Sequence, residues 1–110
     1  MPHFRFRAVA PEIVSSLSKT LINELETVMK SPRIDFTFES IKTDFFHEGI
    51  ADVGYPFVEI LWFDRGQETK DLVAKTVTQH LSGLLPVKQN IAVIFTALEP
   101  ANYYDNGEHY

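Results

Sequence analysis

The chain has 110 residues, a length that supports one hydrophobic core but not two. Apolar residues make up 45% of it and charged residues 23%, which excludes long disordered segments. Lys and Arg number 10 against 15 Asp and Glu, and the resulting net charge of −5 argues against a nucleic-acid partner. There is no cysteine, which excludes disulfide scaffolds, thiolate zinc sites and cysteine nucleophiles.

Hydropathy excludes a membrane partner as well. The longest apolar runs reach about five residues, so neither a membrane-spanning helix nor the hydrophobic region of a signal peptide is expected. We therefore expect a cytoplasmic domain. Nine Phe residues are more than one small core needs, and this excess indicates buried contacts between protomers.

The first elements are a strand and a helix. Apolar and polar residues alternate over residues 3–8, with Phe4 and Phe6 on one face, which predicts a strand with one buried face. Apolar residues then recur at helical spacing from Val14 to Met29, and Pro11 fits the first turn of that helix.

Two further strands and a long connection follow. Residues 34–38 alternate between apolar and polar, beginning with Ile34, and predict a half-buried strand. Glycine and proline punctuate residues 43–56, which indicates a long connection with room for a short strand. Residues 57–63 are apolar apart from Glu59, so we expect a strand covered on both faces.

The second half of the chain repeats the pattern of the first. Apolar residues from Val73 to Leu84 predict a helix that ends at Pro86, and residues 91–95 open a last strand. A shift of 56 or 57 residues brings the apolar positions of the first half onto those of the second, so we expect one domain built from two βαβ units. Its parts are a βαβ unit at about 3–42, a link at 43–56, a βαβ unit at about 57–98 and a tail at 99–110.

The element order predicts an α+β fold. Two right-handed βαβ units place both helices on one face of a four-stranded mixed sheet. A ferredoxin-like domain has the same element order but joins its second and third strands by a hairpin of about two to five residues. The link at 43–56 is far longer, which favours the tautomerase-type arrangement.

Pro2 is the first candidate for chemistry. An initiator methionine before so small a residue is normally removed, and its removal leaves a secondary amine at the start of the first strand. An α-amino group has an ordinary pKa of about 7.7 to 8.0, which nearby cations or an apolar wall lower. Such an amine is a general base near neutral pH and needs no cofactor. Many proteins begin with Met-Pro without any such role; here the strand that follows at once holds the nitrogen in place.

The opening Met-Pro-x-Phe and the two βαβ units resemble the tautomerase superfamily, above all its macrophage-migration-inhibitory-factor (MIF) and 5-carboxymethyl-2-hydroxymuconate-isomerase branches. Residues 55–68, YPFVEILWFDRGQE, also resemble a small bacterial family known only as a domain of unknown function. The resemblance implies a homotrimer with sites between protomers and no cofactor. It also implies an N-terminal proline that moves a proton between the enol and keto forms of a small anionic substrate.

The resemblance extends to four residues. Pro2 matches the catalytic base, and Lys30 matches a cation that binds substrate in some members. Arg33 lies beside Lys30 and is an equal candidate for holding a carboxylate. Arg65 stands where some members place a residue that lines the site, and a guanidinium there would bind a carboxylate in bidentate fashion and stabilise an enolate.

The last strand departs from the family pattern. Some members place a tyrosine and an asparagine there, facing the neighbouring protomer's proline, whereas this chain offers Ile91, Val93 and Phe95. The alternative function is therefore a non-catalytic oligomeric protein that binds a small molecule and retains the tautomerase fold.

The remaining polar residues point to structure. Glu59 stands inside an apolar strand and must find a partner if buried, and we expect Arg5 or Arg7 to supply it. His47 and His109 lack the spacing of metal ligands, so no metal site is expected.

Overall fold

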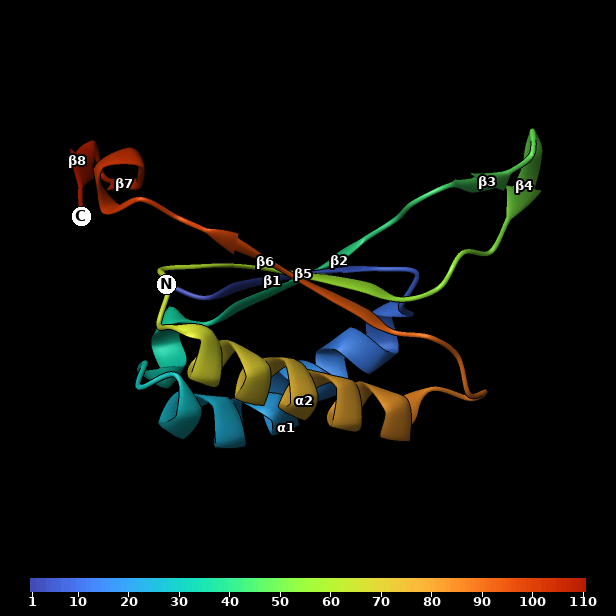
Figure 1. Cartoon of the computed structure of the whole chain (residues 1–110), viewed down its shortest axis with the longest axis horizontal. Helices are drawn as coiled ribbons and strands as arrows, with labels where there is room; N and C mark the ends of the chain where they lie inside the picture. Colours follow the sequence, from blue (N-terminus) through green and yellow to red (C-terminus); the bar gives the residue numbers. More distant parts are fainter.

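Two helices cover one face of a four-stranded sheet in the computed structural model, which describes residues 1–110 (Figure 1). The sheet order is β2 (Thr37–Ile41), β1 (His3–Arg7), β5 (Phe57–Trp62) and β6 (Ala92–Ala97). β1 runs parallel to β2 and antiparallel to β5, and β5 runs parallel to β6. The helices are α1 (Pro11–Val28) and α2 (Gln67–Leu84). The predicted α+β arrangement, with two βαβ units, a mixed sheet and both helices on one face, is confirmed.

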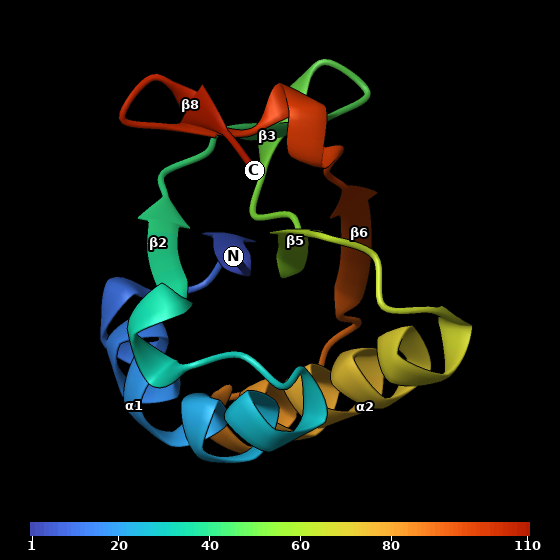
Figure 2. The ribbon, with the colours of Figure 1, turned by 90° about the vertical axis from the view of Figure 1, so that its left-hand side faces the viewer.

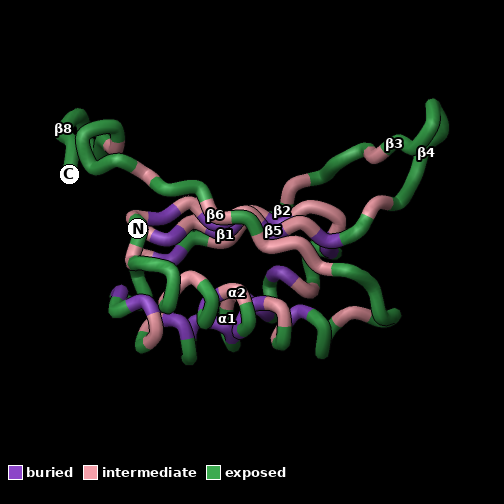
Figure 3. Tube along the Cα trace, viewed as in Figure 1, coloured by how far each residue is buried: buried purple, intermediate pink, exposed green.

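The core lies between the sheet and the helices, because each element has one apolar face. In β1, Phe4 and Phe6 are completely buried, while the residues between them lie half-buried on the open face of the sheet. The ring of Phe4 stacks on Phe38 of β2, with centroids 4.8 Å apart. Leu17 and Leu21 of α1 and Val77 of α2 fill the space below the rings. Figure 3 shows the buried residues in purple, within the strands of the sheet and at intervals along both helices.

Two details of the predicted strands are corrected. Ile34 lies outside the second strand: Arg33–Asp35 form the 3₁₀ turn η1, and Ile34 is 88% exposed. Pro32 fixes φ near −62° at the start of this turn, and its carbonyl oxygen accepts the Asp35 N–H, so the extended backbone of β2 begins only after the turn. β5 is covered by the helices on one face only, and its other face, which carries Glu59, remains half-buried.

Two hairpin arms stand above the sheet on the side away from the helices, at opposite ends of the molecule (Figures 1 and 2). The first arm is the pair β3 (Phe45–His47) and β4 (Ile50–Asp52). The second arm is the pair β7 (Tyr104–Asp105) and β8 (Glu108–His109), which follows the 3₁₀ turn η2 (Pro100–Asn102).

Each arm turns at a two-residue loop that ends in glycine. Glu48 and Gly49 have φ of 48° and 80°, and Asn106 and Gly107 have φ of 53° and 84°. Positive φ at both central residues is the requirement of the turn that matches the twist of a hairpin. Both arms are largely exposed, as the green ends of the tube in Figure 3 show. Neither long helix of the fold is apolar enough to cross a bilayer.

Candidate active site

The first residue of the chain is one of six that line a pocket. The N-terminus lies at the end of the sheet where the second arm also lies (Figure 2). The volume of the pocket is about 430 Å³. The residues that line it are Met1, His3, Thr37, Leu61, Leu98 and Tyr103. They come from the start of β1, the start of β2, the end of β5, the residue after β6 and the segment before the second arm. The wall is mainly apolar, with an imidazole and two hydroxyl groups as its polar members.

Pro2, the residue behind Met1, is held in place by the start of β2. Pro2 is buried, and its carbonyl oxygen accepts the backbone N–H of Thr37 at 3.1 Å. Burial lowers the pKa of the Met1 amine below its ordinary value of 8.0, and the positive charge of Arg65 lowers it further. Asp35 and Asp105 oppose this shift. The net direction is downward, so the amine loses its proton more readily than an exposed one.

Tyr103, which lines the pocket, belongs to an aromatic cluster. The ring of Tyr103 meets the edge of Phe63 at 5.5 Å and that of Tyr110 at 4.8 Å. The Tyr110 hydroxyl donates to Asp105 Oδ2 at 2.8 Å, which raises the pKa of that phenol. Burial raises the pKa of the Tyr103 phenol, with Asp105 and Asp35 adding to the effect. The second arm is thereby held against the end of the sheet that carries the N-terminus.

Arg65 is fastened to the end of α1. Its Nε donates to the Met29 carbonyl oxygen at 2.9 Å, one terminal nitrogen donates to the Phe63 oxygen at 2.7 Å, and the other donates to Ser31 Oγ at 3.0 Å. The guanidinium also lies over the ring of Trp62, 5.4 Å from its centroid. Burial lowers the pKa of this guanidinium, which still carries its charge at any physiological pH.

Lys30 and Arg33, the other two predicted cations, lie in different places. Lys30 is exposed and shares a hollow of about 350 Å³ with Arg65. Arg33 turns toward α1, where it donates to Asn23 Oδ1 at 2.8 Å and lies 3.3 Å from Glu26. Of the three cations, Arg65 alone acts on the charge of the N-terminal amine. The structure thus places Arg65 and Lys30 in one hollow, which neither Met1 nor Pro2 lines, and Arg33 apart from both.

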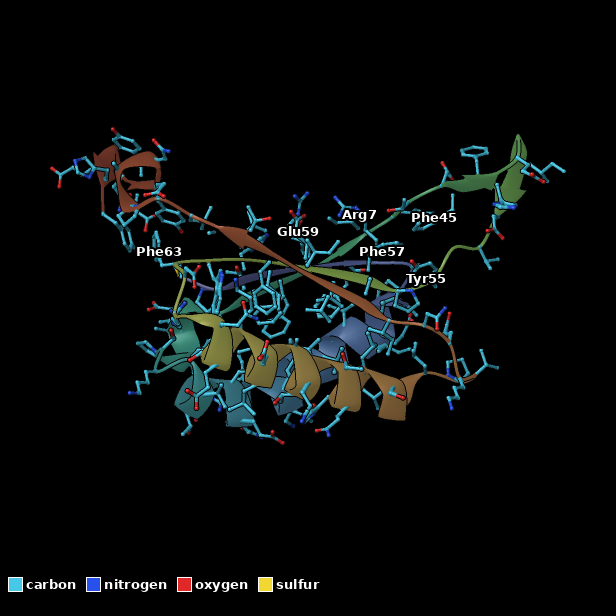
Figure 4. The ribbon with its side chains drawn as sticks, viewed as in Figure 1. Arg7, Phe45, Tyr55, Phe57, Glu59 and Phe63 are labelled. Carbon is cyan, nitrogen blue, oxygen red and sulfur yellow. The ribbon has the colours of Figure 1, made fainter.

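A row of charged side chains crosses the open face of the sheet. Arg5 Nε donates to Glu39 at 2.9 Å, and Glu59 lies 3.4 Å from Arg5 and 3.6 Å from Arg7. Glu59 also accepts the Thr96 hydroxyl at 3.1 Å. Figure 4 shows Arg7 and Glu59 rising from the sheet on the side away from the helices. The expected pairing of Glu59 is confirmed with both arginines.

Several residues of the pocket were not singled out by sequence reasoning. Thr37, Leu61 and Leu98 stand at the ends of predicted strands, where sequence alone does not say which ends meet. Tyr103 lies in the segment interpreted as a tail. The Asn106–Gly107 pair was a usable signal, because this dipeptide between short extended segments is the strongest local indication of a hairpin.

Comparison with known proteins identifies the relatives of this chain. The family model "Domain of unknown function (DUF1904)" matches residues 1–109. The crystal structure of a DUF1904 domain from Sebaldella termitidis is 34% identical in sequence, with full coverage of both chains and a TM-score of 0.92. Among curated protein sequences, none matches this chain.

Two more distant structures share the fold alone. A fused 4-OT, described as a wild type asymmetric trimer, is 12% identical with a TM-score of 0.82, covering 97% of this chain and 94% of its own. A MIF-like protein from Entamoeba histolytica is 14% identical with a TM-score of 0.74, covering 99% of this chain and 98% of its own. The predicted tautomerase-superfamily fold is thereby confirmed, and the chain belongs to the DUF1904 family.

Proposed function

We propose that this protein is a cofactor-independent tautomerase in which Pro2, freed of Met1, is the general base. The observation that carries the proposal is the position of the first residue: Met1 lines an apolar pocket, and burial and Arg65 lower the pKa of its amine. Once Met1 is removed, the Pro2 amine directly behind it would enter the same surroundings. A lowered pKa favours the unprotonated amine, which is the state that accepts a proton from carbon. The tautomerase-superfamily fold supports the same reading.

Removal of Met1 would favour this chemistry in two ways. It converts the Pro2 nitrogen from an amide, which has no useful basicity, into a secondary amine. It also vacates the part of the pocket that Met1 lines, next to His3 and Thr37. The substrate would then occupy that space, with its acidic carbon against the new amine.

Arg65 does not line the pocket, but it is the one predicted cation whose charge lowers the pKa of the N-terminal amine, so we propose that it receives the substrate carboxylate from the hollow it shares with Lys30. Three of its five N–H groups are engaged by Met29, Phe63 and Ser31, which leaves two free. Lys30 shares its hollow and would add a second charge. Arg33 would assist only after release from Glu26. A small keto–enol carboxylate is therefore the substrate class we propose.

We also propose that the protein acts as a homotrimer. Both outer strands, β2 and β6, have one unpaired edge, and Ile94 on β6 is 47% exposed. The first arm exposes Phe46, Ile50 and Val53 by 70% or more, with nothing in the chain to cover them. The charged middle of the open face is poorly suited to a dry contact, so the arms and sheet edges would carry the association. The trimeric description of the fused 4-OT supports this number of copies.

The alternative is a non-catalytic oligomer that binds a small molecule in the same pocket. It is favoured by the open face of β6 beside Glu59, which presents Ile94 and Thr96 rather than a larger hydrogen-bonding pair. A protein that keeps Met1 would fall into this class, because its pocket would hold no basic proline.

The test begins with the intact mass of the untagged protein and proceeds to turnover of phenylpyruvate. We expect a mass lacking one methionine and a fall of about 10²-fold or more in kcat/KM on Pro2→Ala, the size expected for loss of a positioned base. Pro11→Ala, at the first residue of α1, is the matched control and should retain full activity. Full activity of Pro2→Ala would refute the proposal, and a retained Met1 would favour the alternative.

A further inference from the structure

A hydroxyl, an imidazole and a carboxylate form a continuous chain beside the N-terminal residue. His3 Nδ1 contacts Thr37 Oγ1, and His3 Nε2 lies 3.4 Å from Glu39 Oε2. The strand register produces this chain, because Thr37 is the cross-strand partner of His3, and Glu39 follows two residues later on the same face. Both ring nitrogens have an oxygen partner, which fixes the orientation of the imidazole.

This chain connects the pocket with the open face of the sheet. Thr37 and His3 line the pocket together with Met1, whereas Glu39 lies outside it. The side chain of His3 is 33% exposed and that of Glu39 is 42% exposed. The backbone N–H of Thr37 is bonded to the Pro2 oxygen, which keeps its hydroxyl close to the N-terminal residue. One end of the chain would thus meet a bound substrate, and the other can exchange protons with water.

Glu39 is kept in its charged form. The hydrogen bond from Arg5 lowers the pKa of the Glu39 carboxyl, and His3 lowers it further. Arg5 also lies 3.4 Å from Glu59, which in turn lies 3.6 Å from Arg7. The Glu39 carboxylate therefore faces Nε2, and the Thr37 hydroxyl faces Nδ1. In the relay proposed below, the proton on Nδ1 is the one that passes to Thr37.

We propose that Thr37 is the proton donor to the substrate's carbonyl oxygen, with His3 and Glu39 as the residues that recharge it. The inference rests on the proposed function, because Pro2 must take the proton from carbon. In enolisation, the electron pair of the broken C–H bond forms the C=C bond, and the carbonyl π pair moves to oxygen. That oxygen takes the Thr37 hydroxyl proton, and Thr37 takes the proton from His3 Nδ1. His3 and the protonated amine then return to their first states by exchange with water, so nothing else is consumed.

The kinetic test compares two substitutions at Thr37 in the natively processed protein, with phenylpyruvate as the probe. Thr37→Val keeps the shape and removes the hydroxyl, and we expect kcat to fall about 10²-fold while KM changes by less than about twofold. Thr37→Ser keeps a hydroxyl and should restore most of the activity, which a purely structural role would not require. Thr27→Val, on the exposed side of α1, is the matched control and should behave as wild type.

A second measurement tests the chain without turnover. The imidazole nitrogen resonances of His3, identified by their loss in His3→Asn, should shift at Nδ1 in Thr37→Val and at Nε2 in Glu39→Gln. If Thr37→Val leaves the Nδ1 resonance unchanged, that result alone would overturn the proposed proton relay through Glu39, His3 and Thr37. An inactive Pro2→Ala together with a fully active Thr37→Val would overturn the relay and leave the proposed function standing. A fully active Pro2→Ala, or no turnover by the processed wild type, would overturn both.

Discussion

Arg65 Nε donates to the backbone oxygen of Met29 across 2.9 Å, and so joins the turn before α2 to the end of α1. Met29 is buried, and the last carbonyl groups of a helix have no partner within it. The hydrogen bond from Arg65 to Ser31 Oγ secures the residue at which the chain leaves that helix. Arg65 therefore has a structural role in addition to any contact that it makes with substrate.

Replacement of Arg65 by lysine should destabilise the fold. A lysine is a single point donor and cannot span the Met29, Phe63 and Ser31 oxygens together. We expect Arg65→Lys to lower the free energy of unfolding by about 2 kcal/mol, measured by urea denaturation. Arg33→Lys is the control; the contacts of Arg33 are exposed, so its effect should stay below about 0.5 kcal/mol. Equal stability of the two variants would contradict this role of Arg65.

The base of the first arm depends on the absence of a side chain at Gly54. A Cβ there would lie 2.6 Å from the ring of Phe45, which stacks on Phe57 with centroids 6.2 Å apart (Figure 4). Gly49 also has a positive φ, but nothing lies within 4 Å of its Cβ position. Gly54→Ala should therefore lower the melting temperature and the near-ultraviolet dichroism more than Gly49→Ala does. Equal losses in the two variants would mean that the strain of a positive φ, and not the contact with Phe45, determines the effect.

Glu39 should make stability sensitive to acid. Its pKa in the folded protein lies below the ordinary value of 4.5, chiefly through the hydrogen bond from Arg5. The stabilisation is therefore complete above about pH 4.5 and is lost as the pH falls through the folded-state value. Glu39→Gln should flatten the decline of unfolding free energy below pH 4.5. Glu99→Gln is the control: the Glu99 carboxylate has no ion pair, so its loss should leave that decline unchanged.

The first arm should govern self-association. Phe46 and Ile50 are exposed by 70% and 72% on this arm, and a buried charge at either position would oppose association. We expect Phe46→Glu and Ile50→Glu to reduce the sedimenting species to a monomer. Val87→Glu alters a residue in the loop after α2 that is 63% exposed, and it should leave the assembly intact. An assembly that survives both arm substitutions would show that this arm is not the contact.

The sequence predicts the layers of this fold better than it predicts the pocket. The alternation around Phe4 and Phe6 and the helical spacing around Leu17 reflect local periodicity, which burial on one face imposes directly. The pocket depends on which strand ends meet, as when Thr37 comes to lie opposite His3, and no local pattern encodes that register. The prediction for Ile34 was wrong for a related reason. Ile34 is apolar and fits the alternation of the strand, but Pro32 begins a 3₁₀ turn that contains it.

The position of β1 between β2 and β5 has a consequence for biosynthesis. β1 is made before both of its neighbours, so its pairing with the two of them is complete only when residue 62 has emerged. Before then the Met1–Pro2 bond would be open to an aminopeptidase, whereas in the folded sheet Pro2 is buried. Excision of the initiator methionine would thus compete with folding of the nascent chain. The speed of translation through the first arm and β5 would then set the fraction of molecules that carry a free prolyl amine.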